Sequence, residues 1–185
     1  HNAIKIGKIN GSSRINTVLF KGSKTSTDSI VAVTERSAIE LDGASNISFK
    51  NIHIIWTTGE SVVSIHNQCE YIEIDSCYIT GPQGGGGTGV YLISTIDRDF
   101  SPAFGSSNHI KISNSTLEGG SGGIRMSGFS SISRSVGMSV VNNKIRVPNR
   151  GIVMQNLDSV EIVSNDLRPY GTSSPLGFLM QMKTH

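Results

Sequence analysis

Five polar residues stand at matching places around short apolar phrases of this chain: Glu40, Asp42, His66, Tyr91 and Arg125. Three of them stand between two apolar residues, and the other two directly follow such a phrase. Side chains at alternate places of a strand point to the same face. A tyrosine or histidine can remove a proton next to a carboxylate, and an arginine can stabilise the charge that develops. All five are therefore candidate catalytic residues for proton abstraction.

The segment after Tyr91 supplies a second group of candidates, Asp97, Arg98, Asp99 and Phe100. Two carboxylates on either side of an arginine could ligate calcium or form a hydrolase pair. The favoured interpretation is that they pair with that arginine at the tip of a loop. We treat Asp97 and Asp99 as weak candidate metal ligands. We expect no cofactor except calcium, and calcium only if the protein is a lyase.

Aromatic side chains offer candidate stacking faces for sugar rings, because a ring presents a large flat apolar surface. Trp56 and Phe104 fit this role besides Tyr91 and Phe100. The alternative for each ring is packing of a loop onto the body of the protein. The predicted ligand-binding residues are Tyr91, Asp97, Arg98, Asp99, Phe100 and Arg125.

A repeated eight-residue phrase must position these side chains. It has apolar residues at its first, third and eighth places and Asn or Ser at its fifth. Such self-similarity indicates one structural unit stacked several times. The copies are Ile47–Ile54, Ile72–Ile79, Ile110–Leu117, Met138–Ile145 and Val160–Leu167.

A shorter phrase, apolar-variable-apolar, precedes each copy and follows the last. Period-two alternation is typical of a strand with one buried face, and no stretch has a sustained helical period. The short phrases are Ile39–Leu41, Val63–Ile65, Val90–Leu92, Ile124–Met126, Ile152–Met154 and Phe178–Met180. Stacking them in this order predicts two outward columns, one of Glu40, Ser64, Tyr91, Arg125, Val153 and Leu179, the other of Asp42, His66, Ile93, Ser127, Gln155 and Gln181.

A single unit of this kind cannot fold alone. It buries roughly five apolar side chains at about 1.5 to 3 kcal/mol each, against about 1 to 2 kcal/mol of backbone entropy for every ordered residue. Parallel pairing of each strand with its counterparts above and below removes this difficulty. The sequence therefore predicts an all-β solenoid with almost no α-helix. Its sharp corners fall at the fifth-place residues Asn51, Ser76, Asn114, Asn142 and Ser164.

The repeats from Ala38 to Gln181 resemble right-handed parallel β-helix proteins of the pectin-lyase-like class. The opening of the chain, Thr17–Gly22, Asp28–Val31 and Leu41–Ile52, is similar to β-helix regions of secreted and surface proteins of the Bacteroidetes. The resemblance implies about six to seven coils and carries no known catalytic motif. We expect one domain over residues 1–185, with irregular first coils over 1–37 and regular coils over 38–182. We expect it to be a segment of a longer polypeptide.

The composition of the chain disfavours several classes of function. Only 16% of residues are charged and the net charge is +2, so charge favours neither nucleic acid nor an anionic membrane as a partner. No apolar run is long enough for a membrane span. Cys69 and Cys77 flank a predicted strand on an extended path, too far apart for a disulfide, and we expect two free thiols.

The leading hypothesis is an extracellular segment, secreted or at the cell surface, that acts as a glycan-binding, adhesin-like or structural module. Its partners would be a polysaccharide or cell-surface glycan and the rest of its parent chain. One alternative is a polysaccharide lyase or glycoside hydrolase that acts on an acidic polysaccharide. Another is a β-helix of the phage tailspike type.

Overall fold

The computed structural model describes residues 3–23, 29–32, 36–82, 90–95, 105–130 and 132–169, together with the backbone of Met180–Lys183. All regular structure in these ranges is β-strand, which confirms the all-β prediction. The described residues include no helix that is long and apolar enough to cross a membrane.

The strands form three parallel sheets, which are named here by their place in the coil. The first sheet has the order β1 (Ile4–Ile6), β4 (Ser37–Asp42), β7 (Ser61–His66), β10 (Tyr91–Ser94), β13 (Gly122–Ser127), β16 (Arg150–Gln155) and β19 (Met180–Lys183). The second has the order β2 (Val18–Lys21), β5 (Ser45–Lys50), β8 (Glu70–Asp75), β11 (Asn108–Ser113), β14 (Ser135–Val141) and β17 (Leu157–Val163). The third has the order β3 (Ser29–Ala32), β6 (His53–Trp56), β9 (Tyr78–Thr80), β12 (Thr116–Glu118), β15 (Lys144–Val147) and β18 (Asp166–Pro169).

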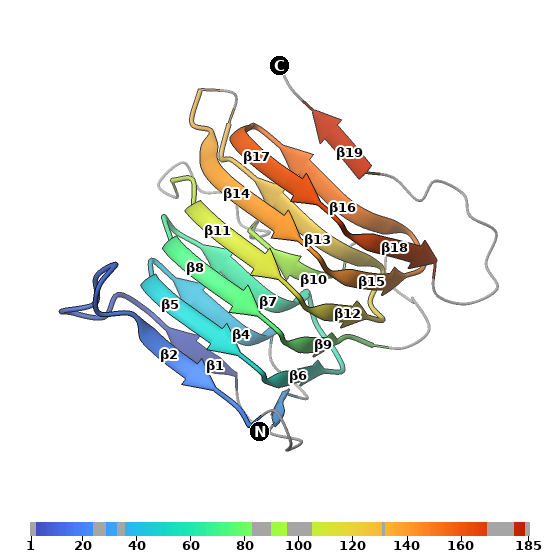
Figure 1. Ribbon diagram of the computed structural model, residues 1–185, viewed down its shortest axis with the longest axis horizontal. Helices are drawn as coiled ribbons and strands as arrows, with labels where there is room; N and C mark the ends of the chain where they lie inside the picture. The colour runs from blue at the N-terminus through green and yellow to red at the C-terminus, as the bar shows by residue number, and fades with distance from the viewer. Residues whose placement is uncertain are drawn as a thin grey trace.

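One strand from each sheet makes one coil, so the described residues contain six coils and the first strand of a seventh. In Figure 1 the second sheet faces the viewer, its strands run from left to right, and successive coils climb from the N-terminal to the C-terminal end. This sense of winding is right-handed, as crossovers between parallel strands almost always are. The predicted right-handed parallel β-helix is thus confirmed.

Columns of aliphatic side chains fill the interior between the sheets. On the first sheet Ile39, Val63, Ile93, Ile124 and Ile152 lie in register, and each is fully buried. The second sheet adds a column that begins with Phe20 and Phe49, whose rings stack with centroids 5.0 Å apart. Each buried aliphatic or aromatic side chain stabilises the fold by roughly 1.5 to 3 kcal/mol. Because the partners come from neighbouring coils, this stabilisation exists only in the stack.

The corners between the second and third sheets have the predicted chemistry. Asn51, Ser76, Asn114, Asn142 and Ser164 have φ angles of 54, 54, 51, 56 and 54°, in the left-handed region. Asn and Ser tolerate this region better than bulky residues do, because their short polar side chains can bond locally. The fifth place of each phrase is therefore fixed by backbone geometry.

The predicted register of the fourth coil is wrong. Ser94, not Tyr91, pairs with Ser64 and Arg125, and Tyr91 pairs with Ser61 and Gly122. As a result Ile93, predicted to point outward, is fully buried. Residues 90–93 are all apolar, so their alternation does not define a register.

The last short phrase is also shifted. Gln181, not Leu179, pairs with Val153, and Met180 pairs with Ile152. An apolar residue at every second place from 178 to 182 fits two registers equally well. The outward columns predicted from the sequence therefore hold only in the second, third, fifth and sixth coils.

Both cysteines are free and buried, as predicted. The Cys69 thiol donates to the carbonyl oxygens of His66 and Leu41 at 3.1 and 3.4 Å. Burial raises the pKa of Cys69 to about 11 and also raises the pKa of Cys77. Both thiols are thus protonated, unreactive members of the core.

A ladder of side chains joins the corners of successive coils around Asp75. Its Oδ1 accepts hydrogen bonds from Ser113 Oγ and Asn114 Nδ2, both at 2.8 Å. Asn114 Oδ1 accepts in turn from Asn142 Nδ2 at 2.7 Å. Burial opposes ionisation of Asp75, but the bonds from Asn114 and Ser113 and the charge of Lys50 outweigh it and lower the pKa of this carboxyl. Asp75 is therefore an ionised member of the corner ladder.

Replacing Asn51 with alanine should lower the free energy of unfolding by about 1 to 2 kcal/mol, because a Cβ is strained in the left-handed region. Asn51→Gly should retain most of the stability, since glycine adopts this region freely. Urea unfolding of the three proteins, followed by circular dichroism, measures the difference. Equal losses in both variants would show that the side chain, not the backbone, matters at this corner.

Wild-type stability should depend on the ionisation of Asp75. A lowered pKa in the folded state means that the stabilisation is present above the unfolded-state pKa of roughly 3.9 and is lost as pH falls through the folded-state pKa. The wild type should therefore exceed Asp75→Asn in unfolding free energy near neutral pH, and the difference should shrink below about pH 4. Urea unfolding of both proteins over this pH range is the measurement. A difference that stays constant over the range would contradict the assignment.

Candidate functional site

Glu40, Asp42 and His66 come together on the outer face of the first sheet, as the sequence predicted. Lys5 Nζ lies 3.1 Å from Glu40 Oε2, and His66 Nε2 lies 3.5 Å from Glu40 Oε1. On the other side of the ring, His66 Nδ1 lies 3.8 Å from Asp42 Oδ1, which accepts from Asn67 Nδ2 at 2.6 Å. The imidazole thus lies between two carboxylates.

Tyr91 and Arg125 also touch, but in a different way. The Arg125 guanidinium carbon lies 5.6 Å from the centroid of the Tyr91 ring, and Tyr91 is only 6% exposed. Within the described residues, no hydrogen bond or ion pair connects either residue to Glu40, Asp42 or His66. The five candidates therefore form two groups and not one catalytic site.

Several side chains on the outer face that carries these groups are buried. Ser64, His66, Ser94 and Ser127 occupy outward columns of the first sheet, yet each is at most 9% exposed. A general base must approach the proton that it removes to hydrogen-bond distance. The burial of His66 and Tyr91 therefore argues against this face as the main binding surface for a polymer.

The remaining candidate stacking residues and metal ligands do not form a binding site in the part of the chain that the structure describes. Asp97, Arg98, Asp99, Phe100 and Phe104 lie outside the described residues. Trp56 is fully buried, so the prediction that it offers a stacking face is wrong. The residues that the structure describes contain no group of three or more His, Cys, Asp and Glu side chains that could hold a metal ion.

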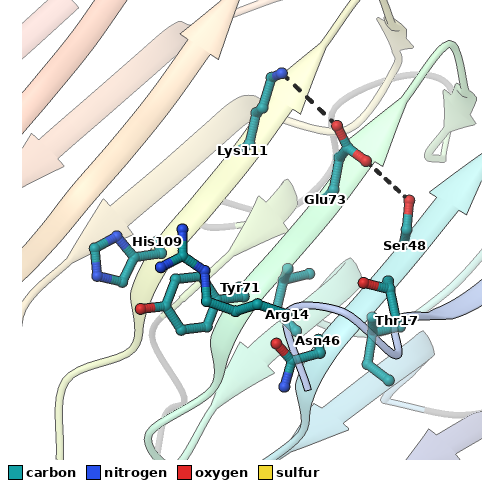
Figure 2. A pocket seen from close by; sticks show the side chains of 10 residues that line it. Arg14, Thr17, Asn46, Ser48, Tyr71, Glu73, His109 and Lys111 are labelled. Carbon is teal, nitrogen blue, oxygen red and sulfur yellow. Dashed lines mark hydrogen bonds and ion pairs between the residues drawn. The ribbon is translucent and has the colours of Figure 1, made fainter. Parts of the chain in front are cut away.

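An open cleft of about 220 Å³ lies instead on the outer face of the second sheet, where β5, β8 and β11 stack. Figure 2 shows three of its side chains lying against one another on one side, with a polar row along the other. The labelled lining residues are Arg14, Thr17, Asn46, Ser48, Tyr71, Glu73, His109 and Lys111.

A stack of Arg14, Tyr71 and His109 forms one wall of the cleft. The tyrosine and imidazole rings are parallel to within 1°, with centroids 4.6 Å apart. The Arg14 guanidinium lies 4.8 Å from the centroid of the tyrosine ring. Cation–π attraction and ring stacking each contribute roughly 0.5 to 1.5 kcal/mol at such sites. The wall therefore carries two stacked aromatic rings beside a cation.

The two rings occupy positions that the backbone strains. Tyr71 and His109 both have φ of 54°, and they share a column with Asn46, Gly137 and Ser159, which have φ of 59, 69 and 57°. Asn, Gly and Ser suit the left-handed region, whereas a bulky ring there is uncommon. Strain of this kind costs about 1 to 3 kcal/mol and is concentrated at functional sites. Two strained aromatic residues in adjacent coils thus mark this wall.

The sequence contained a signal for this column that the alternation rule did not use. Its members directly precede the first apolar residue of every long phrase. Three of the five are Asn, Gly or Ser, the residue types of a left-handed position. Tyr71 and His109 are the exceptions. Arg14 had no such signal, because it comes from the connection before β2.

The opposite wall of the cleft is a row of paired charges. Glu73 Oε2 accepts from Ser48 Oγ at 3.0 Å and pairs with Lys50 Nζ at 3.0 Å, while its Oε1 lies 3.7 Å from Lys111 Nζ. Burial opposes ionisation of Glu73, but the bonds from Lys50 and Ser48 and the charge of Lys111 outweigh it and lower the pKa of the carboxyl. This wall offers charged donors and acceptors close to the rings.

The cleft combines an aromatic wall, a cation and fixed polar groups, which is an arrangement for binding. Glu73 is ionised and held by two lysines, so it does not have the raised pKa of a general acid. Comparisons of the chain with protein-family models, with curated protein sequences and with solved structures found no match. The geometry of the cleft therefore carries the functional interpretation.

The stack makes a specific prediction about Gly137, the next member of the column. A Cβ at this position would lie 2.4 Å from His109 Nδ1, and φ is 69°. Gly137→Ala should therefore lose about 1 kcal/mol from backbone strain and a further 1 kcal/mol or more from contact with the imidazole. In the His109→Ala background only the backbone part should remain.

A double-mutant cycle by urea unfolding measures this coupling between positions 137 and 109. We expect a coupling energy of about 1 kcal/mol. Additive effects would mean that the imidazole does not occupy its position over Gly137 in solution.

Proposed function

We propose that this β-helix is a binding module for an extended glycan, with the cleft along β5, β8 and β11 as the binding surface. The observation that carries the proposal is the Tyr71–His109 stack in strained backbone at an open cleft. Aromatic side chains offer sugar rings an apolar contact surface, and neighbouring polar groups bind the hydroxyls. Glu73, Ser48 and Lys111 are the polar groups in reach.

The repetition of the fold favours a polymer over a small ligand. Outward columns run parallel to the helix axis, with successive coils about 4.8 Å apart. A ligand that lies along the axis therefore meets a comparable position in each coil. Binding at several weak positions accumulates into useful affinity.

The location and partner expectations belong to the same proposal. A low charge content and a glycan ligand agree with a protein at the cell surface or in the extracellular space. The resemblance to pectin-lyase-like proteins favours a carbohydrate partner. We place binding before catalysis, because the acid–base candidates His66 and Tyr91 are buried while the aromatic cleft is open.

Tyr71→Asn should weaken polysaccharide binding without lowering the stability of the fold. Asparagine suits a left-handed φ and already occupies position 46 of the same column, so the variant should fold with equal or greater stability. Loss of the ring should weaken polysaccharide binding about tenfold, the equivalent of 1.4 kcal/mol. Affinity gel electrophoresis against a panel of neutral and acidic polysaccharides measures the binding.

Tyr78→Ala is the matched control. This tyrosine is 38% exposed on the third sheet, outside the cleft. Its loss should leave unchanged the extent to which polysaccharide in the gel slows the migration of the protein (its retardation). Equal retardation of the wild type and Tyr71→Asn, or no retardation by any polysaccharide, would reject the proposal. Release of unsaturated or reducing ends from the panel would favour the lyase or hydrolase alternative.

A further inference from the structure

A second cationic centre lies on the first sheet, where β10, β13 and β16 begin. Tyr91, Gly122 and Arg150 are in register there on three successive coils. Arg150 Nη1 lies 3.5 Å from Tyr91 Oη, although a whole coil separates the two residues. Arg125, three residues after Gly122, lies over the same ring at 5.6 Å. Two guanidinium groups therefore converge on one phenol.

Gly122 makes this convergence possible. A Cβ at this position would lie 2.6 Å from two carbons of the Tyr91 ring. Gly122 does not have a positive φ, so the backbone does not require glycine there. The missing side chain provides the space in which the phenol leans over the next coil and reaches Arg150.

Neither guanidinium has a counter-ion in the part of the chain that the structure describes. The other arginines in the fifth and sixth coils are paired: Arg134 with Asp158 at 2.9 Å, and Arg146 and Arg168 with Asp166 at 2.7 and 3.1 Å. Arg125 lies over the tyrosine ring, and its Nε is buried with no hydrogen-bond partner among the described residues. A buried unsatisfied donor destabilises the fold, and two like charges at one phenol add to this.

We propose that Arg125, Arg150 and the Tyr91 hydroxyl form a binding site for a single oxyanion, a carboxylate or a sulfate or phosphate group. Arginine presents a planar fork of donors that matches such groups, and the phenol adds one more donor. An anion there would offset the repulsion between the two guanidinium groups. Arg150 is exposed and Arg125 is partly exposed, so the site is reachable from solvent. This site is separate from the aromatic cleft and does not rest on glycan binding.

The test is a titration of the intact protein with sodium phosphate, sodium sulfate or sodium glucuronate, at constant ionic strength set with sodium chloride. The Nε–H resonances of Arg125 and Arg150 are followed by ¹⁵N-correlated NMR. Saturable shifts of both resonances with at least one anion are expected. The anion whose chemical shifts saturate at the lowest concentration shows whether the site prefers a tetrahedral oxyanion, such as sulfate or phosphate, or a planar carboxylate. Shifts that grow linearly without saturation for all three anions overturn the proposal.

Variants distinguish anion binding from a structural role. Arg125→Met keeps the length of the side chain but removes the charge and the unsatisfied donor. It should weaken anion binding on the order of tenfold while raising the thermal midpoint. Arg150→Gln, at an exposed position, should weaken binding without unfolding the protein.

Arg134→Met is the control, because that arginine is already paired with Asp158. Anion binding should remain unchanged in this variant. A lowered thermal midpoint in Arg125→Met, together with an unchanged anion titration in Arg150→Gln, would mean that the two arginines serve the fold alone.

Discussion

Parallel, in-register pairing between successive coils is the interaction on which the rest of this structure depends. Each strand of an inner coil is hydrogen-bonded to its counterparts on both sides. This pairing fixes the spacing between coils at about 4.8 Å. Each strand residue of an inner coil therefore lies above one partner and below another. Aliphatic columns, corner ladders and the Tyr71–His109 stack are consequences of this spacing.

The same constraint explains why strain can be tolerated in the second sheet. The column of Asn46, Tyr71, His109, Gly137 and Ser159 is left-handed in five successive coils, which lie in register with one another. A ring at such a position is strained, but it gains a parallel neighbour at 4.6 Å. Selection for stability alone favours Asn or Gly there. Rings in two adjacent coils therefore point to a requirement other than folding.

The sequence predicted most of the fold, because each repeated phrase reports a local constraint. Alternation marked the strands, and Asn or Ser at the fifth place marked the corners. The register failed at residues 90–93, where four apolar residues in a row leave both faces equally apolar. Only pairing with Ser61 and Gly122 shows that Tyr91 begins the strand. Local pattern is thus sufficient where one face is polar and insufficient where it is not.

The candidate site was less predictable, because exposure is a property of the whole surface. Alternation correctly indicated that Glu40 and His66 lie on one face, but all six residues of β7, including His66, are buried. In β11 of the second sheet, by contrast, His109 and Lys111 are exposed. Arg14 reaches the cleft from a connection that shares no repeat with β8 or β11.

The aromatic cleft and the Arg125–Arg150 site also differ in how their charges are paired, which neither exposure nor alternation reveals. In the cleft, Glu73 pairs with both Lys50 and Lys111, so the charges of its polar wall are paired with one another. At the start of β13 and β16, Arg125 and Arg150 have no carboxylate partner among the described residues. A wall of paired charges beside aromatic rings offers donors and acceptors to the hydroxyls of sugars, whereas two guanidinium groups without a carboxylate partner suit one concentrated negative charge. The two surfaces therefore differ in the ligand group that each can accept, and the pairing of the charges determines that difference.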